Sequence, residues 1–278
     1  MTLYESILYG IVQGLCEFLP ISSSGHLSLL HSFFGSEISG GTLCFDLFLH
    51  LGTLFAVVTL YRKDILLLIK AFFSLTAKLF QGNFHLSLYT HEERWVVFTI
   101  IAALPLIPAA LLSDEVSFIM NYPVAVGSLL VLNALLLSVS ERLGRNIKGL
   151  EEMTSKNALV IGLCQLVAIL PGISRSGMTI NAGLSQGLNR ESAVRFSFIT
   201  SIPTILGASV VTLPSLLKNE HLLTENAPLY LAGAASAAIT GILSIGLLRL
   251  ISKRSSFKVF SVYCAVIGAG AIIFQILN

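Results

Sequence analysis

The chain has 278 residues, of which 54% are hydrophobic and 12% are charged, and its mean hydropathy is +0.83. About a quarter of the residues in a soluble globular domain are charged, so this composition excludes that class. The 17 basic and 15 acidic residues nearly cancel, which leaves no basic surplus to bind a nucleic-acid backbone. We therefore expect an integral membrane protein with no nucleic-acid partner.

Apolar runs of about 20 residues, the length that crosses a bilayer, recur along the chain. In chain order they predict six full transmembrane helices, over 44–61, 94–113, 122–140, 195–217, 228–249 and 259–277. Two other apolar regions, 3–35 and 157–188, are interrupted by proline, glycine and serine. An interrupted backbone at membrane depth must be buried in protein or line a wet cavity, so we expect both regions to be re-entrant helix pairs.

The charges of the loops predict the orientation, because short loops rich in lysine and arginine stay on the cytoplasmic side. The cations cluster after the first, third and fifth spans and before the fourth: Arg62, Lys63, Lys70, Lys78, Arg142, Arg145, Lys148, Lys156, Arg190, Arg195, Arg249, Lys253, Arg254 and Lys258. The opposite loops hold Asp114 and Glu115, and Lys218 with Glu220 and Glu225. All basic loops share one side only if neither broken region crosses, which places both termini outside. The chain opens without a positively charged segment, so we expect no cleaved signal peptide.

The two broken regions are similar in sequence. Gly14-Leu15-Cys16-Glu17 and Leu19-Pro20-Ile21-Ser22-Ser23-Ser24-Gly25 correspond to Gly162-Leu163-Cys164-Gln165 and Leu170-Pro171-Gly172-Ile173-Ser174-Arg175-Ser176-Gly177. We expect a single membrane domain over 1–278, built from inverted repeats at approximately 1–140 and 157–278. Such repeats bring their discontinuous helices together near the midplane, where the polar breaks form one shared site. Chance similarity between short motifs is the alternative.

The first break carries the residue types of a phosphate site. Gln13 and Glu17 lie one turn apart on one helix face, and a carboxylate in a membrane segment indicates a functional site or a structural ion pair. Ser22, Ser23, Ser24 and Gly25 supply hydroxyls and a helix start, whose free N–H groups suit phosphate. His26 could be the general base for Ser23 or an acid for the leaving group, or it could bridge neighbouring helices.

The second break contributes a cation. The planar guanidinium of Arg175 fits phosphate oxygens, and an ion pair with Glu17 is a compatible alternative. Ser174, Ser176 and Gly177 surround it at a second helix start. A carboxylate, a hydroxyl, an imidazole and a guanidinium together match phosphoryl transfer. Glu17 with Gln13 could also bind a hard divalent cation such as Mg²⁺ together with substrate phosphates.

These motifs strongly resemble the bacterial undecaprenyl pyrophosphate phosphatase family, also called bacitracin-resistance proteins. Its (E/Q)xxxE, PxSSxGH and PGxSRSG motifs fit residues 13–17, 20–26 and 171–177, and the resemblance extends to His50-Leu51-Gly52-Thr53 and Phe196-Ser197-Phe198. This chain takes the glutamine option at position 13, which leaves Glu17 as the one carboxylate of that motif.

The resemblance implies six spans plus two re-entrant pairs, and hydrolysis of undecaprenyl diphosphate, a polyprenyl diphosphate lipid, to undecaprenyl phosphate and inorganic phosphate. It also implies a divalent cation (Mg²⁺ or Ca²⁺) and a site on the bacterial inner (plasma) membrane that faces the periplasm. By position, Glu17 would be the metal-binding or general-base carboxylate, Ser23 the nucleophile, His26 its acid/base partner and Arg175 the diphosphate clamp. Whether Ser23 attacks or positions a water is open. Gln13, Ser22, Ser24, Gly25, Ser174, Ser176 and Gly177 are the predicted substrate-binding residues.

Three further points remain open in the sequence. Asp46 and His50, four residues apart, could support the site or contact water. The GxxxG spacing of Gly10 and Gly14 predicts close helix packing, as do the small residues of 232–246, which could also form a homodimer contact. A secondary transporter or a lipid flippase on the same scaffold is the alternative function, although a transporter needs no paired hydroxyl and imidazole.

Overall fold

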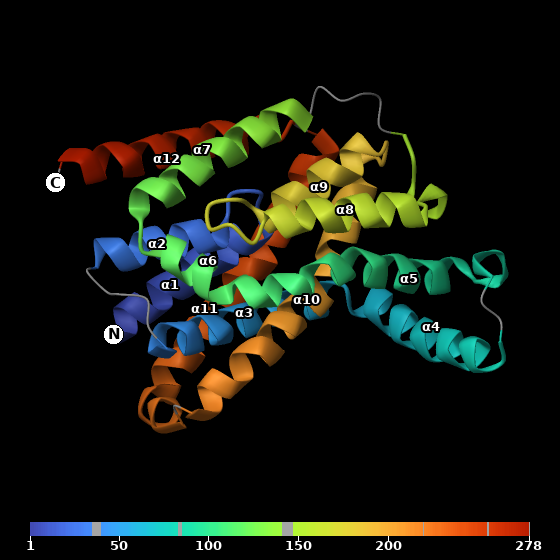
Figure 1. Ribbon diagram of the computed structural model, residues 1–278, viewed down its shortest axis with the longest axis horizontal. Coiled ribbons are helices and arrows are strands. Elements are labelled where there is room, and N and C mark those ends of the chain that lie inside the picture. Colours follow the sequence, from blue (N-terminus) through green and yellow to red (C-terminus); the bar gives the residue numbers. More distant parts are fainter. Residues whose placement is uncertain (35–39, 83–84, 141–146, 219, 255, 278) are drawn as a thin grey trace.

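The computed structural model describes residues 1–34, 40–82, 85–140, 147–218, 220–254 and 256–277, and they are almost entirely helical (Figure 1). The helices are α1 (Leu3–Phe18), α2 (Ser23–Phe33), α3 (Gly40–Leu60), α4 (Arg62–Phe80), α5 (His91–Ala103), α6 (Ser113–Met120), α7 (Pro123–Ser140), α8 (Ser155–Val167), α9 (Arg175–Ser185), α10 (Arg190–Lys218), α11 (Glu220–Arg254) and α12 (Lys258–Leu277). Short 3-10 helices are η1 (Leu86–Leu88), η2 (Leu104–Leu106), η3 (Pro108–Leu112) and η4 (Leu150–Glu152). No β-strand occurs in these ranges, which confirms the predicted all-α class.

In the described part of the chain, three helices are long and apolar enough to cross a membrane. They cover Arg190–Thr212, Asn226–Lys253 and Lys258–Leu277, which overlap the last three predicted spans. The first predicted span falls on α3 and the third on α7. Arg142 and Arg145 lie outside the described residues, as do the side chains of Asp114, Lys218, Glu220, Glu225 and Arg254.

The predicted continuous helix over 94–113 is wrong. Helix α5 ends at Ala103, and the chain continues through η2 and η3 before α6 begins. Pro105 and Pro108 lie in this segment, and a proline has no N–H to donate to the preceding turn of an α-helix. Two predicted loops are also largely helical, since 114–121 falls on α6 and 218–227 contains the start of α11.

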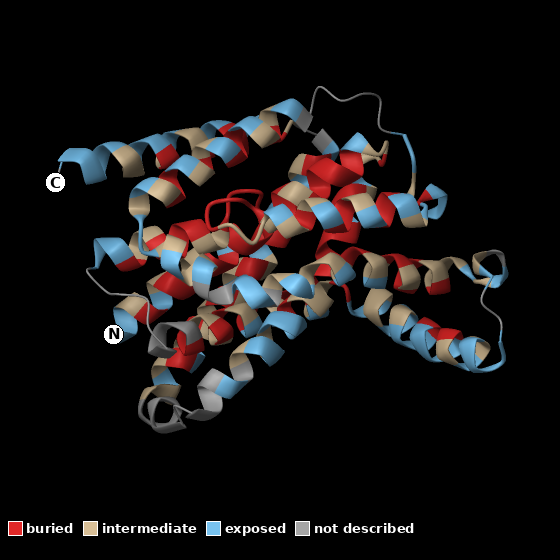
Figure 2. Cartoon of the chain, in the orientation of Figure 1, coloured by how far each residue is buried: buried red, intermediate tan, exposed pale blue. Residues whose placement is uncertain are grey.

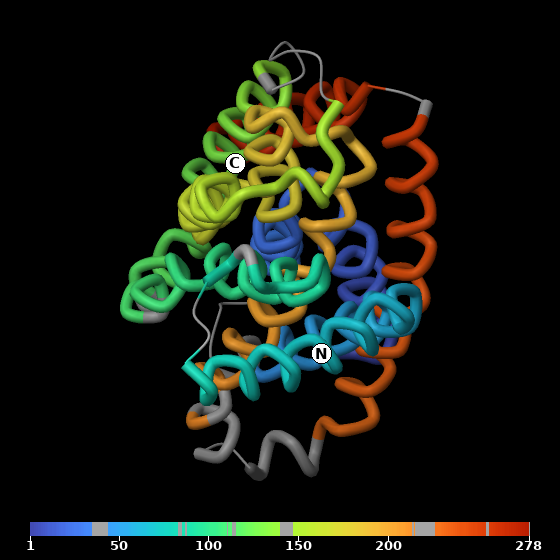
Figure 3. The backbone as a smooth tube through the Cα atoms, turned by 90° about the vertical axis from the view of Figure 1, so that its right-hand side faces the viewer, coloured from blue at the N-terminus to red at the C-terminus, as the bar shows by residue number. Residues whose placement is uncertain are grey.

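Helix α4 occupies a segment that the sequence analysis treated as a basic loop. The chain bends by 89° between α3 and α4. In Figure 3, α4 crosses the molecule below its centre and α11 runs along one side. Arg195 fixes the start of α4 with two hydrogen bonds to the carboxylate of Asp64, at 2.7 and 3.1 Å. The Arg195 guanidinium also lies 4.9 Å from the ring centroid of Trp95, so α4, α5 and α10 are tied together.

Both predicted breaks are present in the chain. The first separates α1 from α2 over residues 19–22, and the second separates α8 from α9 over residues 168–174. Each following helix begins with a serine cap: the Ser22 hydroxyl accepts from the Gly25 N–H, and the Ser174 hydroxyl accepts from the Gly177 N–H. The two connections lie in the buried interior of the molecule (Figure 2).

The small residues of α1 and α11 pack closely, as the GxxxG spacing predicted. A Cβ on Gly10 would meet the Ser236 hydroxyl and the Gly233 carbonyl, and a Cβ on Gly14 would meet the Thr240 hydroxyl and the α11 backbone. The α1 backbone therefore approaches α11 more closely than an alanine would allow. This contact uses the small residues of α11 within the chain.

We expect Gly14→Ala to destabilise the protein by about 1–3 kcal/mol, because the added methyl group overpacks the α1–α11 contact. Thermal unfolding of the detergent-purified protein measures the effect. Gly246→Ala is the control, since a Cβ at this α11 position meets no atom within 4 Å. Equal melting temperatures for the two variants would contradict the close packing.

Candidate active site

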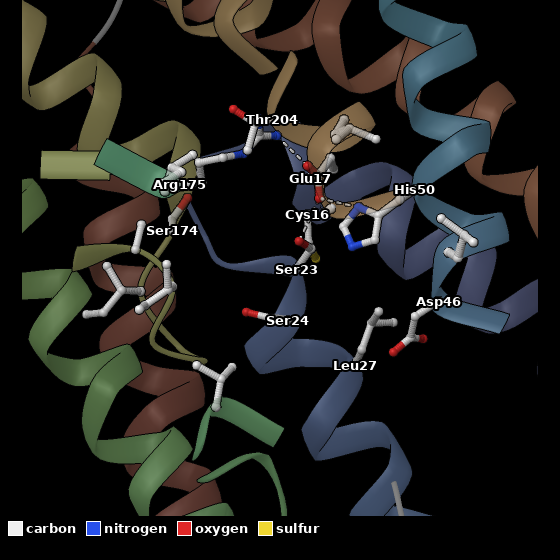
Figure 4. Close-up of a pocket in the computed structure, with 18 of the residues that line it drawn as sticks. Cys16, Glu17, Ser23, Ser24, Leu27, Asp46, His50, Ser174, Arg175 and Thr204 are labelled. Atoms are coloured by element: carbon white, nitrogen blue, oxygen red, sulfur yellow. Dashed lines mark hydrogen bonds and ion pairs between the residues drawn. The ribbon is translucent and has the colours of Figure 1, made fainter. Parts of the chain in front are cut away.

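A cavity of about 390 Å³ lies beside the two breaks (Figure 4). Five of the predicted site residues line it: Glu17, Ser23, Ser24, Ser174 and Arg175. Much of the remaining wall is apolar and comes from α2, α3, η2, α6, α10 and the second break: Leu27, Leu47, Leu106, Val116, Met120, Ile169, Ile173, Ile205 and Ala208. The cavity thus combines one polar, charged region with apolar walls, which suits a ligand that has a polar head and an apolar tail.

Glu17 is the centre of the polar region. One carboxylate oxygen pairs with the Arg175 guanidinium, so the ion pair joins the end of α1 to the start of α9. The other oxygen accepts a hydrogen bond of 2.8 Å from the Ser23 hydroxyl and one of 3.0 Å from the Gln13 amide. The structure therefore brings the predicted carboxylate, hydroxyl and guanidinium into direct contact.

Gln13 lies behind this carboxylate and does not line the cavity. It is 0% exposed, and its amide nitrogen also lies 3.0 Å from His50 Nδ1. The carboxylate of Glu17 can only accept, so the NH₂ group of Gln13 must face it, and His50 Nδ1 is then the acceptor of the second contact. The prediction that Gln13 touches substrate is not supported, because the side chain orients Glu17 and His50 instead.

His26 occupies a different place from the one its sequence position suggested. Its Nδ1 lies 2.7 Å from the carbonyl of Ser22, its Nε2 lies 3.0 Å from the Tyr263 hydroxyl, and its ring stacks on that of Tyr263. Both ring nitrogens are therefore engaged, and the side chain does not line the cavity. The geometry does not support His26 as the acid/base partner of Ser23, and the imidazole that lines the cavity belongs to His50.

Ser22 holds the two breaks together. Its hydroxyl accepts from the N–H of Gly172 at 3.1 Å as well as from Gly25, and its φ of 71° is the single positive value among the described non-glycine residues. Such a backbone costs about 1–3 kcal/mol and persists only where the surroundings fix it. The bond between His26 and the Ser22 carbonyl is one of these constraints. Ser22 is thus a scaffold residue of the site.

Asn133 of α7 is a second scaffold residue, and the sequence analysis missed it. Its amide donates to the carbonyl of Pro20 at 3.2 Å, and its oxygen accepts from the N–H of Ser174 at 3.0 Å, so one side chain bridges both breaks. Ser176 adds a bond from its hydroxyl to the Leu19 carbonyl. A lone asparagine in the apolar run 122–140 was the available signal, because buried polar groups in membrane segments need partners.

The glycines of the motifs serve the contact between the breaks. A Cβ on Gly25 would lie 2.9 Å from the Cα of Gly172, and Gly172 itself has a φ of 114°, which favours glycine. A Cβ on Gly177 would lie 3.3 Å from that of Pro20. Gly25 and Gly177 do not line the cavity, so their predicted role in binding substrate is not supported; both permit the close approach of the two chain segments.

Seven polar residues that were not predicted as site residues also line the cavity: Asp46, His50, Ser117, Gln165, Thr204, Ser209 and Thr212. His50 Nδ1 lies 3.6 Å from Glu17. Gln165 donates to the Ala102 carbonyl, and its own side-chain oxygen is buried without a hydrogen-bond partner among the described residues. The signal for Gln165 was its correspondence to Glu17 in the aligned breaks.

The donor set of the cavity fits a cation that is completed by substrate. The described residues contain no group of three or more His, Cys, Asp or Glu side chains that could bind a metal alone. Glu17 and Asp46 nevertheless both line the cavity, and Asp46 Oδ1 is buried with no partner in the described part of the chain. Mg²⁺ commonly takes one or two carboxylates plus substrate phosphates, which is what these residues offer.

Comparisons with known proteins agree over the full chain. Residues 6–270 match the family described as Bacitracin resistance protein BacA. A protein of Methanosphaera stadtmanae named undecaprenyl-diphosphatase is 40% identical, over 100% of this chain and 99% of the relative. Proteins of the same name from Methanobrevibacter smithii and Pelotomaculum thermopropionicum are 41% identical (96% of each chain) and 35% identical (98% of this chain, 97% of the relative).

We expect Arg175→Ala to destabilise the protein by about 3–5 kcal/mol, because it leaves the buried Glu17 carboxylate without its cation. Glu17→Gln in the same chain should recover part of this loss, since no unpaired charge remains. Thermal unfolding of the two single variants and the double variant measures the coupling between them. Effects that add within about 0.5 kcal/mol would show that the pair is not coupled.

Proposed function

We propose that this chain, which belongs to the bacitracin resistance protein family, is a membrane phosphatase that hydrolyses undecaprenyl diphosphate to undecaprenyl phosphate and inorganic phosphate. The observation that carries the proposal is the contact of one buried carboxylate with a serine hydroxyl and a guanidinium inside a largely apolar cavity. The product is the monophosphate form of a lipid carrier for cell-wall synthesis. Removal of the diphosphate lipid links the same reaction to bacitracin resistance.

In this mechanism Arg175 binds the diphosphate. Phosphate oxygens compete with the Glu17 carboxylate for the guanidinium, whose fork can hold two of them at once. The N–H groups at the start of α2 and α9 add partial positive charge on the same side. Transfer of Arg175 from Glu17 to the substrate then frees one Glu17 oxygen, while the other still accepts from Ser23 and Gln13.

Ser23 is the proposed nucleophile and Glu17 its general base. The Ser23 hydroxyl already donates to Glu17 at 2.8 Å, within the distance that proton transfer requires. Attack of its oxygen on the terminal phosphorus would form a phosphoserine, send the proton to Glu17 and release undecaprenyl phosphate. Glu17 would pass this proton to the departing undecaprenyl phosphate. It would then take a proton from a water molecule whose oxygen attacks the phosphoserine, and return that proton to the Ser23 oxygen as inorganic phosphate leaves.

A divalent cation, Mg²⁺ or Ca²⁺, is part of the proposal. When bound, it would neutralise charge on the diphosphate oxygens. Glu17 is the motif residue that would hold it, although both Glu17 oxygens have protein partners. The cation would therefore take its remaining ligands from the oxygens of the diphosphate.

The lipid tail is proposed to remain in the bilayer. A cavity of about 390 Å³ has room for a diphosphate and the first part of a tail, and its apolar wall suits the latter. The mouth of the cavity is proposed to face the outside of the plasma membrane, in agreement with the loop charges.

The finer architecture is also a proposal: six spans and two re-entrant pairs in an inverted repeat. Contacts between the two halves support it. Helices α1 and α3 of the first half both pack on α11 of the second half. Their counterparts in the second half, α8 and α10, both pack on α5 of the first half. Helices α7 and α12, the last of each half, pack on each other (Figure 1). Gly233 and Thr240 of α11 pack inside the chain, whereas Gly246 is exposed, and a homodimer contact through the small residues of 232–246 stays a prediction.

Purified wild-type protein in detergent, given undecaprenyl diphosphate and Mg²⁺ or Ca²⁺, should release inorganic phosphate. Ser23→Ala should lower the rate at least about a hundredfold, because the attacking oxygen is lost. Ser32→Ala, an exposed position on the same helix, is the control and should keep the wild-type rate. No release by the wild type with several lipids and metals would reject the function, and substantial turnover by Ser23→Ala would reject the nucleophile.

The proposed orientation can be tested with cysteines introduced at Phe118, which is 62% exposed, and Ile147, which is 81% exposed. In cells, a membrane-impermeant thiol reagent should label position 118 directly and position 147 only after permeabilisation. The opposite pattern would invert the topology.

A further inference from the structure

We propose that Asp46 is the second carboxylate ligand of the divalent cation, in the place that Gln13 cannot fill. This inference rests on the proposed function, in that the cation is shared with a bound diphosphate. It assigns the ligand to α3, outside the two serine-containing breaks.

The cavity wall holds one carboxyl group without a cationic partner. Among the described residues that line it, the Asp, Glu, Lys and Arg side chains are Glu17, Asp46 and Arg175. Glu17 and Arg175 form an ion pair, so Asp46 has no cation beside it in this wall. A diphosphate adds more negative charge, and Arg175 is the one protein cation available to it in this wall. A buried charge without a partner is costly, so binding of the substrate favours a cation next to Asp46.

One oxygen atom of Asp46 has no protein donor in the described part of the chain. Asp46 Oδ1 is buried and has no hydrogen-bond partner among the described residues, whereas both oxygens of Glu17 are engaged by protein donors. An acceptor in this state needs a proton donor or a metal ion. The residue lines the cavity, and Figure 4 shows its carboxylate on the same side as His50.

The register of α3 places Asp46 near the reacting groups. Asp46 and His50 are four residues apart, so their side chains lie one turn apart on one face of the helix. His50 reaches to within 3.6 Å of Glu17. A diphosphate held by Arg175 would therefore share this cavity with a carboxylate from α1 and a carboxylate from α3. This arrangement supplies the two carboxylates and phosphate oxygens that Mg²⁺ sites commonly use.

The experiment measures metal binding without turnover. Full-length protein in detergent is titrated with Mn²⁺, and the free ion is counted by electron paramagnetic resonance, with and without a polyprenyl methylenediphosphonate that cannot be hydrolysed. The wild type should bind Mn²⁺ more tightly when the diphosphonate is present. Asp46→Asn should weaken this binding at least about tenfold, because a direct ligand is lost. Asp64→Asn, the same change at a carboxylate paired with Arg195 outside the cavity, should leave the affinity unchanged.

A second variant separates ligation from folding. Asp46→Cys replaces a hard oxygen ligand by a thiolate, which prefers soft ions. Its phosphate release should be low with Mg²⁺ and recover with Cd²⁺, a change of preference that a merely structural role of Asp46 would not produce.

The outcomes distinguish this inference from the proposed function. Wild-type affinity for Mn²⁺ in Asp46→Asn, or absence of any Cd²⁺ recovery in a folded Asp46→Cys protein, would overturn the assignment of Asp46 even if the wild type releases phosphate. Tight binding of Mn²⁺ that depends on Asp46, in a wild type that releases no phosphate, would reject the phosphatase and retain the metal ligand.

Discussion

The ion pair between Glu17 and Arg175 is the interaction on which the rest of the site depends. It joins the end of one broken helix pair to the start of the other, and it allows two opposite charges to be buried together in an apolar protein. The hydroxyl of Ser23 and the amide of Gln13 complete the shell of the carboxylate. A negatively charged substrate can displace Glu17 from the guanidinium, so the resting contact and the binding step use the same group.

The breaks themselves impose the second constraint. Each interruption exposes backbone groups that must find partners inside the protein. Ser22, Asn133 and Ser176 supply those partners, and Gly25 and Gly172 allow the segments to touch. Much of what a motif search would assign to substrate binding is therefore scaffold. The residues that face the cavity are a smaller set, and some of them come from α3 and α8.

Sequence patterns predicted the helical class, both breaks and the last three long helices, because burial and charge determine the composition of these segments. They offered the contact between Glu17 and Arg175 as an alternative that is compatible with a role of Arg175 in binding phosphate. They failed where two signals compete. The run 94–113 is largely apolar, yet its prolines end α5 at Ala103. His26 follows Ser23 closely in sequence, yet its ring turns to the Ser22 carbonyl and Tyr263. Asp46 and Gln165 could not be placed, since only the packing of α3 and α8 brings them to the cavity.

The correspondence between the breaks has a consequence for how such a site can arise. Two identical subunits that met in opposite orientations would present the same side chain twice, one from each copy. In this chain the equivalent positions have diverged: Glu17 corresponds to Gln165, and Ser23 to Arg175. Because both halves belong to one polypeptide, their equivalent positions can differ. The first half supplies Glu17 and Ser23, and the second half supplies the cation Arg175. An asymmetric reaction centre can thus occupy a nearly symmetric scaffold.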